Sequence, residues 1–532
     1  MPNNTGAPKI IFSTVDISEL PPALSTSVGA MVIGLNKGDV DKPMLITDKA
    51  KLIDLCCVNK PEVTDLGIYA ALGFLDQGRQ LYIMRVHNSA LYGGIEFKKA
   101  TSPYSATPLG AGETAPTAHT FGADGLFLVA AQNPGAWSGD ISVSISDVDS
   151  SDYTFKIKVY VDDSDGVAQL QETWEVSRKQ QIDGYGNQQY LETKINGYSK
   201  YIKVVNYSGE GDTVLPNAVS TPIYMDGGSN GSTVTTQNVV DGWDKFSNTF
   251  DKSVNILMTG GYTATAVLAK VNSIAAARQD AFAVLDLPLD VTATSVDSQV
   301  TWANNNLNLN SSYAAVYSPW IKIFDEYNGQ QLTVPPSGHV GSVYALTDRV
   351  YNSAHGAPAG YNRGILNCLG LSNIETYNES EMDVLCEGKI NPIIKDPGFG
   401  FIVFDELTTQ KKNSALKNIH VRRLINQIQK ASVSTARKYL MEPLIERTYF
   451  RVRTEFEEYL GQLEGLGAFD NNNDRGWKVV CDSRNNTATD RDMDTLNIWI
   501  FIKPVKIARY IQIKAVITRS SANFDAVIAA GV

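Results

Sequence analysis

Histidine is the residue type best suited to proton transfer near neutral pH and to metal binding, and this chain of 532 residues has five. Their spacing forms no His-Glu-x-x-His or other two-histidine metal motif, and the Gly-x-x-x-x-Gly-Lys-Ser/Thr phosphate loop is absent. We therefore predict that the protein is not an enzyme and has no catalytic residue, metal site or cofactor. The five histidines are His87, His119, His339, His355 and His420.

Two turn-like segments could still hold an ion. The glycine cluster at residues 226–231 could cradle a phosphate, but it lacks the strand-then-helix setting, so a turn joining two domains is favoured. Asp162-Asp163-Ser164-Asp165-Gly166 resembles part of a calcium loop. Thr173 stands where that loop needs a glutamate, so a polar hairpin turn is favoured.

The cysteine content and the N-terminal sequence indicate the cellular compartment in which the chain folds. The five cysteines are odd in number and form no Cys-x-x-Cys pair, so a disulfide framework or zinc site is not expected and a reducing compartment fits. The start of the chain has no apolar signal core, and no apolar run approaches the roughly 20 residues of a membrane helix. We expect neither Sec export nor membrane insertion.

Charge is unevenly distributed along the chain. The net charge of −11 argues against a general nucleic-acid binder. Residues 411–438 nevertheless contain eight basic residues and no acid, and residues 503–519 contain five more and again no acid. The basic C-terminal part is either a solvated face or a surface that meets an acidic partner.

Hydrophobic patterns divide the chain into α/β, all-β and α+β parts. The α/β pattern predicts strands at 28–35, 80–86, 254–258, 281–286 and 313–323, and helices at 47–55, 65–75, 264–278 and 342–351. Strand-like runs at 126–131, 141–146, 153–161 and 201–205 form the all-β stretch. The last part has a long amphipathic helix over 445–463, strands at 477–481 and 496–502, and an alternating strand pattern over 505–517.

Nine segments in sequence order resemble the contractile tail sheath family of myophages and related contractile injection machines. Each segment is weak alone, but together they span nearly the whole chain. The family's Pro-Gly-x-Trp turn is matched from Pro134 onward, and its Gly-Gly turn is matched at Gly227. The segment that begins at Pro335 resembles the family's central signature. The segments include 27–34, 81–86, 131–143, 224–228, 335–341, 357–360, 390–400, 418–424 and 477–482.

The resemblance implies a multidomain fold that combines the α/β and α+β classes. It implies a central layered α/β domain with a subtilisin-like layout, a β-rich outer insertion, and an α+β C-terminal inner domain with extended terminal arms. The expected domains are an N-terminal arm at 1–20, the first part of the α/β domain at 21–95, the insertion at 96–225, the central domain at 226–404, the inner domain at 405–503 and a C-terminal strand arm at 504–532.

The implied function is that of a structural subunit. It would polymerise helically around a tail tube and contract to drive the tube through the host envelope for genome delivery. The implied partners are other copies in stacked six-fold rings, the tail tube protein, and baseplate and tail terminator proteins, without nucleic acid. The expected location is the virion tail, after synthesis in the host cytoplasm.

Two sets of residues are candidates for assembly contacts. Strands at both ends could add to a neighbour's sheet edge, as in β-augmentation, or could pair within their own subunit. The basic segment at 411–438, which we expect to be helical, could face the tube, or its arginines could bond acids within their own domain. The candidate strand-exchange residues are Ile11, Phe12, Val15, Ile17, Val505, Ile507, Ile511, Ile513 and Ile517. The candidate tube-facing residues are Lys417, Arg422 and Arg423.

Three alternatives stay open at this point. The chain could be the sheath of a phage-derived injection machine encoded by a bacterium. It could be a subtilisin-like hydrolase, although His355 has no obvious serine and aspartate partners in the sequence. It could also be a secreted surface-layer or adhesin protein, although the lack of a signal peptide argues against this alternative.

Overall fold

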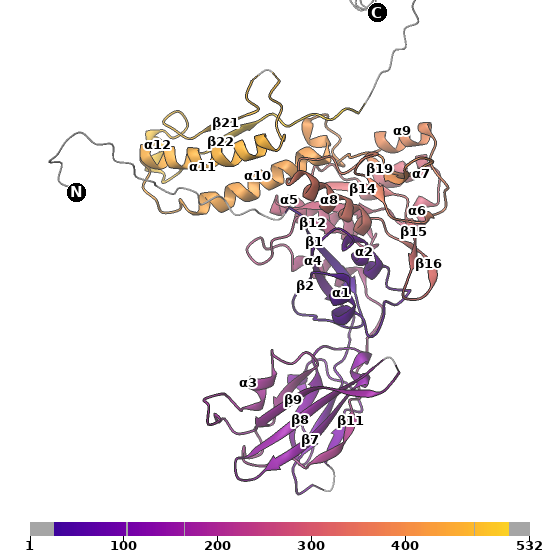
Figure 1. Ribbon diagram of the computed structural model, residues 1–532, viewed down its shortest axis with the longest axis vertical. Coiled ribbons are helices and arrows are strands. Elements are labelled where there is room, and N and C mark those ends of the chain that lie inside the picture. Colours follow the sequence, from indigo (N-terminus) through magenta and orange to yellow (C-terminus); the bar gives the residue numbers. More distant parts are fainter. Residues whose placement is uncertain (1–25, 103–104, 164, 473, 510–532) are drawn as a thin grey trace, which may run out of the picture. The chain divides into compact units, whose positions relative to one another are not determined.

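The computed structural model describes residues 26–102, 105–163, 165–472 and 474–509, and their contacts divide the chain into two compact units. The first unit ends at Pro443 and the second begins at Leu444 (Figure 1). Our predicted boundary at 405 assigns the basic helix to the C-terminal domain. The contacts of this helix instead place it in the first unit, because its buried side chains hydrogen-bond to other residues of that unit.

A nine-stranded sheet lies at the centre of the first unit. Its order is β17-β20-β19-β14-β13-β12-β1-β3-β2. The central run from β19 to β3 is parallel, whereas β2, β20 and β17 pair antiparallel to their neighbours. The bounds are β1 Val28–Gly34, β2 Met44–Ile46, β3 Gln80–Val86, β12 Ile256–Met258, β13 Phe282–Asp286, β14 Ala314–Ser318, β17 Ile365–Leu366, β19 Ile390–Asp396 and β20 Gly400–Val403.

Both faces of this sheet are buried, which explains why its strands are almost wholly apolar. Successive side chains point to opposite faces, so Met31 and Ile33 belong to one core cluster and Ala30 and Val32 to another. The first cluster includes side chains of α1, α2 and α8, and the second includes side chains of α4 and α5. The predicted mixed α/β architecture is confirmed, while the subtilisin-like layout stays a prediction.

The helices predicted at 47–55, 65–75 and 264–278 are seen as α1, α2 and α5, each within two residues of its predicted bounds. Helix α1 begins after Asp48, whose Oδ1 accepts a hydrogen bond from the Lys51 N–H at 2.8 Å, as expected for an N-cap. Helix α8 begins five residues before the predicted start at 342. The bounds are α1 Lys49–Cys56, α2 Leu66–Phe74, α3 Leu191–Ile195, α4 Thr236–Asp244, α5 Thr265–Arg278, α6 Leu289–Thr292, α7 Val296–Trp302, α8 Ser337–Tyr351, α9 Glu379–Glu387 and α10 Ile419–Arg437.

One predicted strand divides into two. The pattern at 313–323 becomes β14 and β15 (Ile321–Asp325), with Pro319 between them. Proline has no N–H for a ladder hydrogen bond, so the chain leaves the large sheet there. Strand β15 joins a separate three-stranded sheet with β16 (Gln330–Val334) and β18 (Gly370–Leu371).

The predicted β-rich insertion consists of two four-stranded sheets, in the orders β10-β6-β4-β5 and β11-β7-β8-β9. Side chains from both sheets form one shared core, which includes Phe97, Phe127 and Phe155. Strand β9 was missed because most of its side chains face solvent and give little apolar signal. The bounds are β4 Gly94–Lys98, β5 Ala106–Pro108, β6 Gly125–Ala131, β7 Ile141–Asp149, β8 Thr154–Asp162, β9 Ala168–Ser177, β10 Ile202–Asn206 and β11 Val219–Tyr224.

The second unit is an α+β structure built on one long helix. Helix α11 (Glu446–Gly465) lies within two residues of the predicted range 445–463. It packs against a two-stranded sheet of β21 (Trp477–Val480) and β22 (Trp499–Ile502), and α12 (Ala488–Asp492) lies between these strands in sequence. Among the described helices, none combines the length and the apolar character needed to cross a membrane.

Candidate assembly surfaces

His355 does not have the neighbours of a hydrolase base. It is 4% exposed, and its ring contacts the Tyr351 ring edge-on at 4.9 Å between centroids. Its Nδ1 has no hydrogen-bond partner, whereas a catalytic triad needs that atom bound to a carboxylate. Burial also lowers the pKa of His355. The hydrolase alternative receives no support from this arrangement.

A buried serine–aspartate contact was missed by the sequence reasoning. Ser337, the first residue of α8, donates from Oγ to Asp286 Oδ2 at 2.6 Å and from its backbone N–H to Oδ1 at 2.8 Å. Thr259 Oγ1 and the Gly261 N–H also donate to Oδ2, at 2.8 and 3.0 Å. Four hydrogen bonds satisfy this carboxylate, so the cluster ties β13 to the start of α8. An aspartate closing an apolar strand was its only sequence signal.

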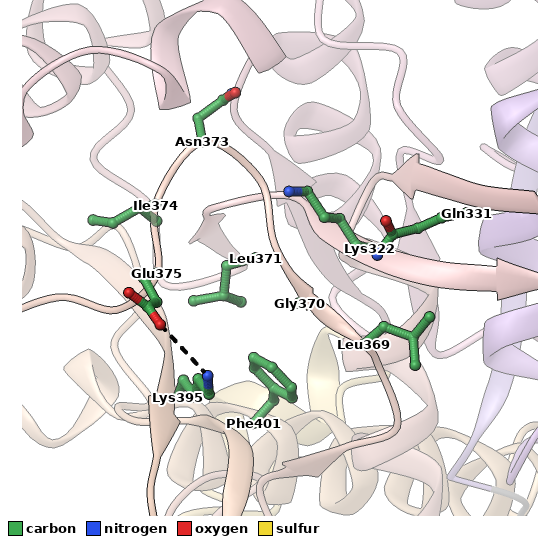
Figure 2. Close-up of a pocket in the computed structure, with 10 residues that line it drawn as sticks. All are labelled: Lys322, Gln331, Leu369, Gly370, Leu371, Asn373, Ile374, Glu375, Lys395 and Phe401. Carbon is green, nitrogen blue, oxygen red and sulfur yellow. Dashed lines mark ion pairs between the residues drawn. The ribbon is translucent and has the colours of Figure 1, made fainter.

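The pocket in Figure 2 has a volume of about 420 Å³. Its only drawn ion pair joins Glu375 and Lys395 at 3.8 Å, and both side chains are largely exposed. The lining contains no histidine, cysteine or serine, so it does not hold the serine–histidine or cysteine–histidine pair of a hydrolase. The lining residues are Lys322, Gln331, Leu369, Gly370, Leu371, Asn373, Ile374, Glu375, Lys395 and Phe401.

Both ion-binding candidates of the sequence are turns. Asp163 Oδ1 accepts hydrogen bonds from the N–H groups of Asp165 and Val167, each at 3.0 Å, in the connection between β8 and β9. The glycine cluster pairs with the segment that leads into the insertion, through bridges that include Leu91–Ser229 and Gly94–Asp226. The cluster is thus a turn, and its role in joining two domains stays a prediction.

The same glycine cluster also spells Gly-x-Ser-x-Gly over residues 227–231, a spacing used by nucleophile elbows. Such an elbow needs a strand before the serine and a helix directly after it. Here Ser229 lies in the linker, and its Oγ accepts a hydrogen bond from the Gly231 N–H at 3.1 Å. The pattern is therefore a linker turn.

The structure buries two of the three candidate tube-facing residues. Arg423 on α10 is 3% exposed and donates to Asp348 on α8 in a bidentate pair, at 2.8 Å from Nη1 and 2.6 Å from Nη2. Its guanidinium also lies 4.7 Å from the Tyr344 ring centroid. Of the two interpretations considered, bonding to an acid of the same domain is the one seen for Arg423.

Arg422 is 6% exposed, lies 4.2 Å over the Tyr313 ring and donates from Nε to Asn426 Oδ1 at 2.9 Å. A tube contact requires an exposed cation, so the tube-facing hypothesis for Arg422 and Arg423 needs correction. Helical periodicity turns these positions towards the sheet domain. Lys417, which precedes α10, is partly exposed, and its Nζ donates to Asn413 Oδ1 at 2.9 Å.

Most of the candidate strand-exchange residues lie outside the described residues: Ile11, Phe12, Val15, Ile17, Ile511, Ile513 and Ile517. The other two, Val505 and Ile507, lie in irregular structure rather than in the predicted strand. The Val505 N–H donates to the Ala468 carbonyl at 3.2 Å. The strand prediction therefore fails over 505–509.

The sheet of the second unit is incomplete by itself. In the described part of the unit, β21 and β22 pair only with each other, so each presents an open edge. One face packs on α11, where Trp477 Nε1 donates to Glu464 Oε2 at 2.8 Å. The other face exposes Trp499 and Phe501, at 51% and 54%. Two-stranded sheets are marginal in water, and open edges are templates for added strands.

Comparison with known proteins identifies the architecture. Residues 232–409 match the family described as phage tail sheath protein central domain. This part of the chain is therefore similar to the central domain of phage tail sheath proteins. The matched range contains the Asp286–Ser337 contact and most of the nine-stranded sheet.

Two phage relatives support the assignment at the sequence level. The chain is 30% identical over 331 residues to the tail sheath protein of Enterobacteria phage T4, covering 58% of this chain and 49% of that protein. It is also 30% identical over 224 residues to the tail sheath protein of Vibrio phage KVP40, covering 42% of this chain and 32% of that protein. The chain thus spans half or less of the length of these relatives.

Solved sheath structures share the fold. The sheath tail protein from Listeria innocua aligns with a TM-score of 0.57 and 10% identity, over 86% of this chain and 89% of that one. The helical sheath of the anti-feeding prophage in its contracted state aligns with a TM-score of 0.52 and 15% identity, over 97% and 99% of the two chains. At these identities the likeness shows the fold alone.

Proposed function

We propose that this chain is the structural subunit of a contractile tail sheath. It polymerises helically around a tail tube and contracts to drive the tube through the host envelope. The observation that carries the proposal is the two-stranded sheet of the second unit, whose open edges and exposed Trp499 and Phe501 leave room for strands from other copies. The match of residues 232–409 to the central domain of phage tail sheath proteins supplies the context for this sheet.

Strand exchange would link neighbouring copies. An arm of about six residues that adds to an open edge forms several hydrogen bonds, each worth about 0.5–1.5 kcal/mol net. Burial of the exposed aromatic face adds roughly 25 cal/mol per Å². Links of this kind survive large movements of the domains they join, because the arm itself need not detach. Residues 9–17 and 505–518 are the proposed exchanging segments.

The tube contact, by contrast, has to release. We assign it to Lys417 together with the exposed Lys411 and Lys412, which precede α10. Surface ion pairs are worth about 0–1 kcal/mol each and are screened by salt, so many of them hold weakly and release together. The partner surface on the tube would be acidic. The insertion, with its acidic loops, is assigned to the outside of the sheath.

Negative-stain electron microscopy of the purified full chain at increasing concentration tests the proposal. We expect hollow, regular tubes, and we expect deletion of residues 1–18 to abolish them while the subunit stays folded. Deletion of the insertion should leave polymerisation intact. Monodisperse particles at every concentration, also after mixing with a tail tube protein and a baseplate, would contradict a self-assembling sheath.

A bacterially encoded injection machine is the second candidate function. It is favoured by the likeness to the anti-feeding prophage sheath, whose coverage of both chains is nearly complete. The subunit would act in the same way, so the genes beside the coding sequence decide between the two. Capsid and terminase genes would establish a phage, and their absence beside tube and baseplate genes would establish an injection machine.

A further inference from the structure

The N-terminal segment enters the sheet domain beside the buried Arg423–Asp348 pair. Thr26 is the first described residue, and β1 begins two residues later at Val28. The Thr26 carbonyl accepts a hydrogen bond from Arg423 Nη2 at 3.4 Å. The Thr26 side chain also hydrogen-bonds to the Asp348 carboxylate. Both members of the buried pair therefore hold the same residue.

The next contact along the chain fastens the same point to the sheet. The Val28 carbonyl accepts a hydrogen bond from the Asn255 N–H at 2.8 Å, and the Asn255 carbonyl accepts one from the Phe282 N–H at 2.8 Å. From Val28 onward, β1 is paired with β3 on one side and with β12 on the other. Thr26 is thus the last point before the sheet at which the N-terminal segment is held by side chains.

We propose that Arg423 and Asp348 are positioning residues that anchor the root of the N-terminal arm, so that load carried by the arm passes through Thr26 into α8 and α10. The inference rests on the proposed strand exchange, because only an arm held by another copy carries load. Two helices and a sheet then share a pull that would otherwise act on the first hydrogen bonds of β1.

The chemistry of the pair suits this task. A bidentate arginine–carboxylate pair fixes direction as well as distance, and lysine cannot reproduce it with a single ammonium group. Asp348 and Arg423 have side chains that are each 3% exposed, so water does not compete for these bonds. The side chain of Tyr344, below the guanidinium, donates or accepts a hydrogen bond to Tyr317 at 2.6 Å and completes a rigid base.

Hydrogen exchange in the full-length monomer tests the anchor with an internal reference. The Asn255 amide reports whether Val28 stays in place, and the Phe282 amide reports on the adjacent sheet bond that does not involve the arm root. In Thr26→Val and Arg423→Lys, we expect Asn255 to exchange at least tenfold faster while Phe282 stays within twofold of the wild type. The matched control is Arg422→Lys, a buried arginine of the same helix that bonds to Asn426 and not to Thr26.

Three outcomes would overturn the anchor. If hydrogen exchange became faster by the same factor at the Asn255 and Phe282 amides, Arg423 would only stabilise the domain as a whole. No acceleration in Thr26→Val, the gentler variant, would mean that Thr26 is not held by the pair. An effect of equal size in Arg422→Lys would remove the specificity of the contact.

A second measurement separates this inference from the sheath proposal. If the wild type forms tubes, Thr26→Val tubes should assemble at a similar concentration but fragment more under shear, by about threefold or more in the fraction broken. If no variant forms tubes, the monomer exchange result still decides whether the arm root is anchored. Unchanged shear resistance together with faster Asn255 exchange would show an anchor that bears no load.

Discussion

The nine-stranded sheet of the first unit and the two-stranded sheet of the second unit differ in how complete they are. In the first unit, nine strands are buried between helices on both faces, and glycines allow backbones to approach closely. In the second unit, two strands have open edges, and Trp499 and Phe501 are half-exposed. Among the described residues, the first sheet has edges only at β17 and β2 and buries both of its faces, whereas the second sheet has an open edge on each strand and exposes one face. We propose that strands from other copies complete the second sheet.

Gly338→Ala should show the largest effect in this comparison. A Cβ at residue 338 would overlap the backbone carbonyl of Ala70, so α2 and α8 would have to move apart. We expect a loss of about 3 kcal/mol or more in the free energy of unfolding, measured by urea denaturation. The control is Gly465→Ala in the second unit, where a Cβ meets nothing within 4 Å. Similar losses in both variants would erase the contrast in packing between the units.

The second-largest effect should be the pH dependence of the stability of the first unit. Burial lowers the pKa of His339 to about 4, because its ring lies against Gly73 with Nδ1 unpartnered. The folded state then keeps His339 neutral while the unfolded state takes up a proton below about pH 6.5. Stability should therefore fall as the pH drops from 6.5 towards 4, by up to roughly 3 kcal/mol.

Urea denaturation of wild type and His339→Asn over this pH range measures that contribution. His355, whose pKa burial also lowers, is present in both proteins, so the difference between the two curves isolates His339. The slope with pH should be shallower in the variant. Identical slopes would show that His339 is protonated equally in the folded and unfolded states.

The exposed aromatic face should affect assembly and not folding. Trp499→Ser with Phe501→Ser should leave the free energy of unfolding of the monomer within about 0.5 kcal/mol. The concentration at which tubes form should rise at least tenfold, which corresponds to about 1.4 kcal/mol per subunit. Tyr185→Ser, at a residue 94% exposed in the insertion, is the control. Unchanged tube formation in the double variant would show that this face is not where copies join.

Lys417→Glu should have the smallest effect. Its side chain is half-exposed and makes one hydrogen bond to Asn413, so the fold should not change. Binding to tubes should weaken by about 0–1 kcal/mol at low salt, and the difference should vanish at high salt. Cosedimentation with purified tail tubes at two salt concentrations measures it. A defect that persists at high salt would indicate a structural role for Lys417.

Local patterns in the sequence predicted many of the longer elements of both units but missed several short ones, such as β2, β17 and α12. Strand β3 matches its prediction residue for residue, and helices α5 and α11 were located within two residues. Apolar runs and helical spacing are local signals, so they survive folding. Strands β9 and β15 were missed or merged, because one exposes most of its side chains and the other is separated from β14 only by a proline turn.

The candidate contacts were predicted less well, and the arginines show why. A run of basic residues without acids indicates a charged surface, but α10 turns Arg422 and Arg423 inward and leaves the preceding lysines outside. Asp348, the partner of Arg423, lies 75 residues earlier in the chain. No local pattern pairs residues at that separation. The buried Asp286–Ser337 contact, across 51 residues, was missed for the same reason.

The sequence alone determined the resemblance to tail sheath proteins, the succession of α/β, all-β and α+β parts, and the absence of any recognised metal or phosphate-loop motif, because those signals lie in residue order and composition. Only the tertiary structure decided which charges are buried, which sheet is complete and which is open, and where the N-terminal segment is held. Burial and long-range pairing depend on which distant segments meet. A side chain such as Arg423 therefore acquires its role only when α8, α10 and Thr26 come together.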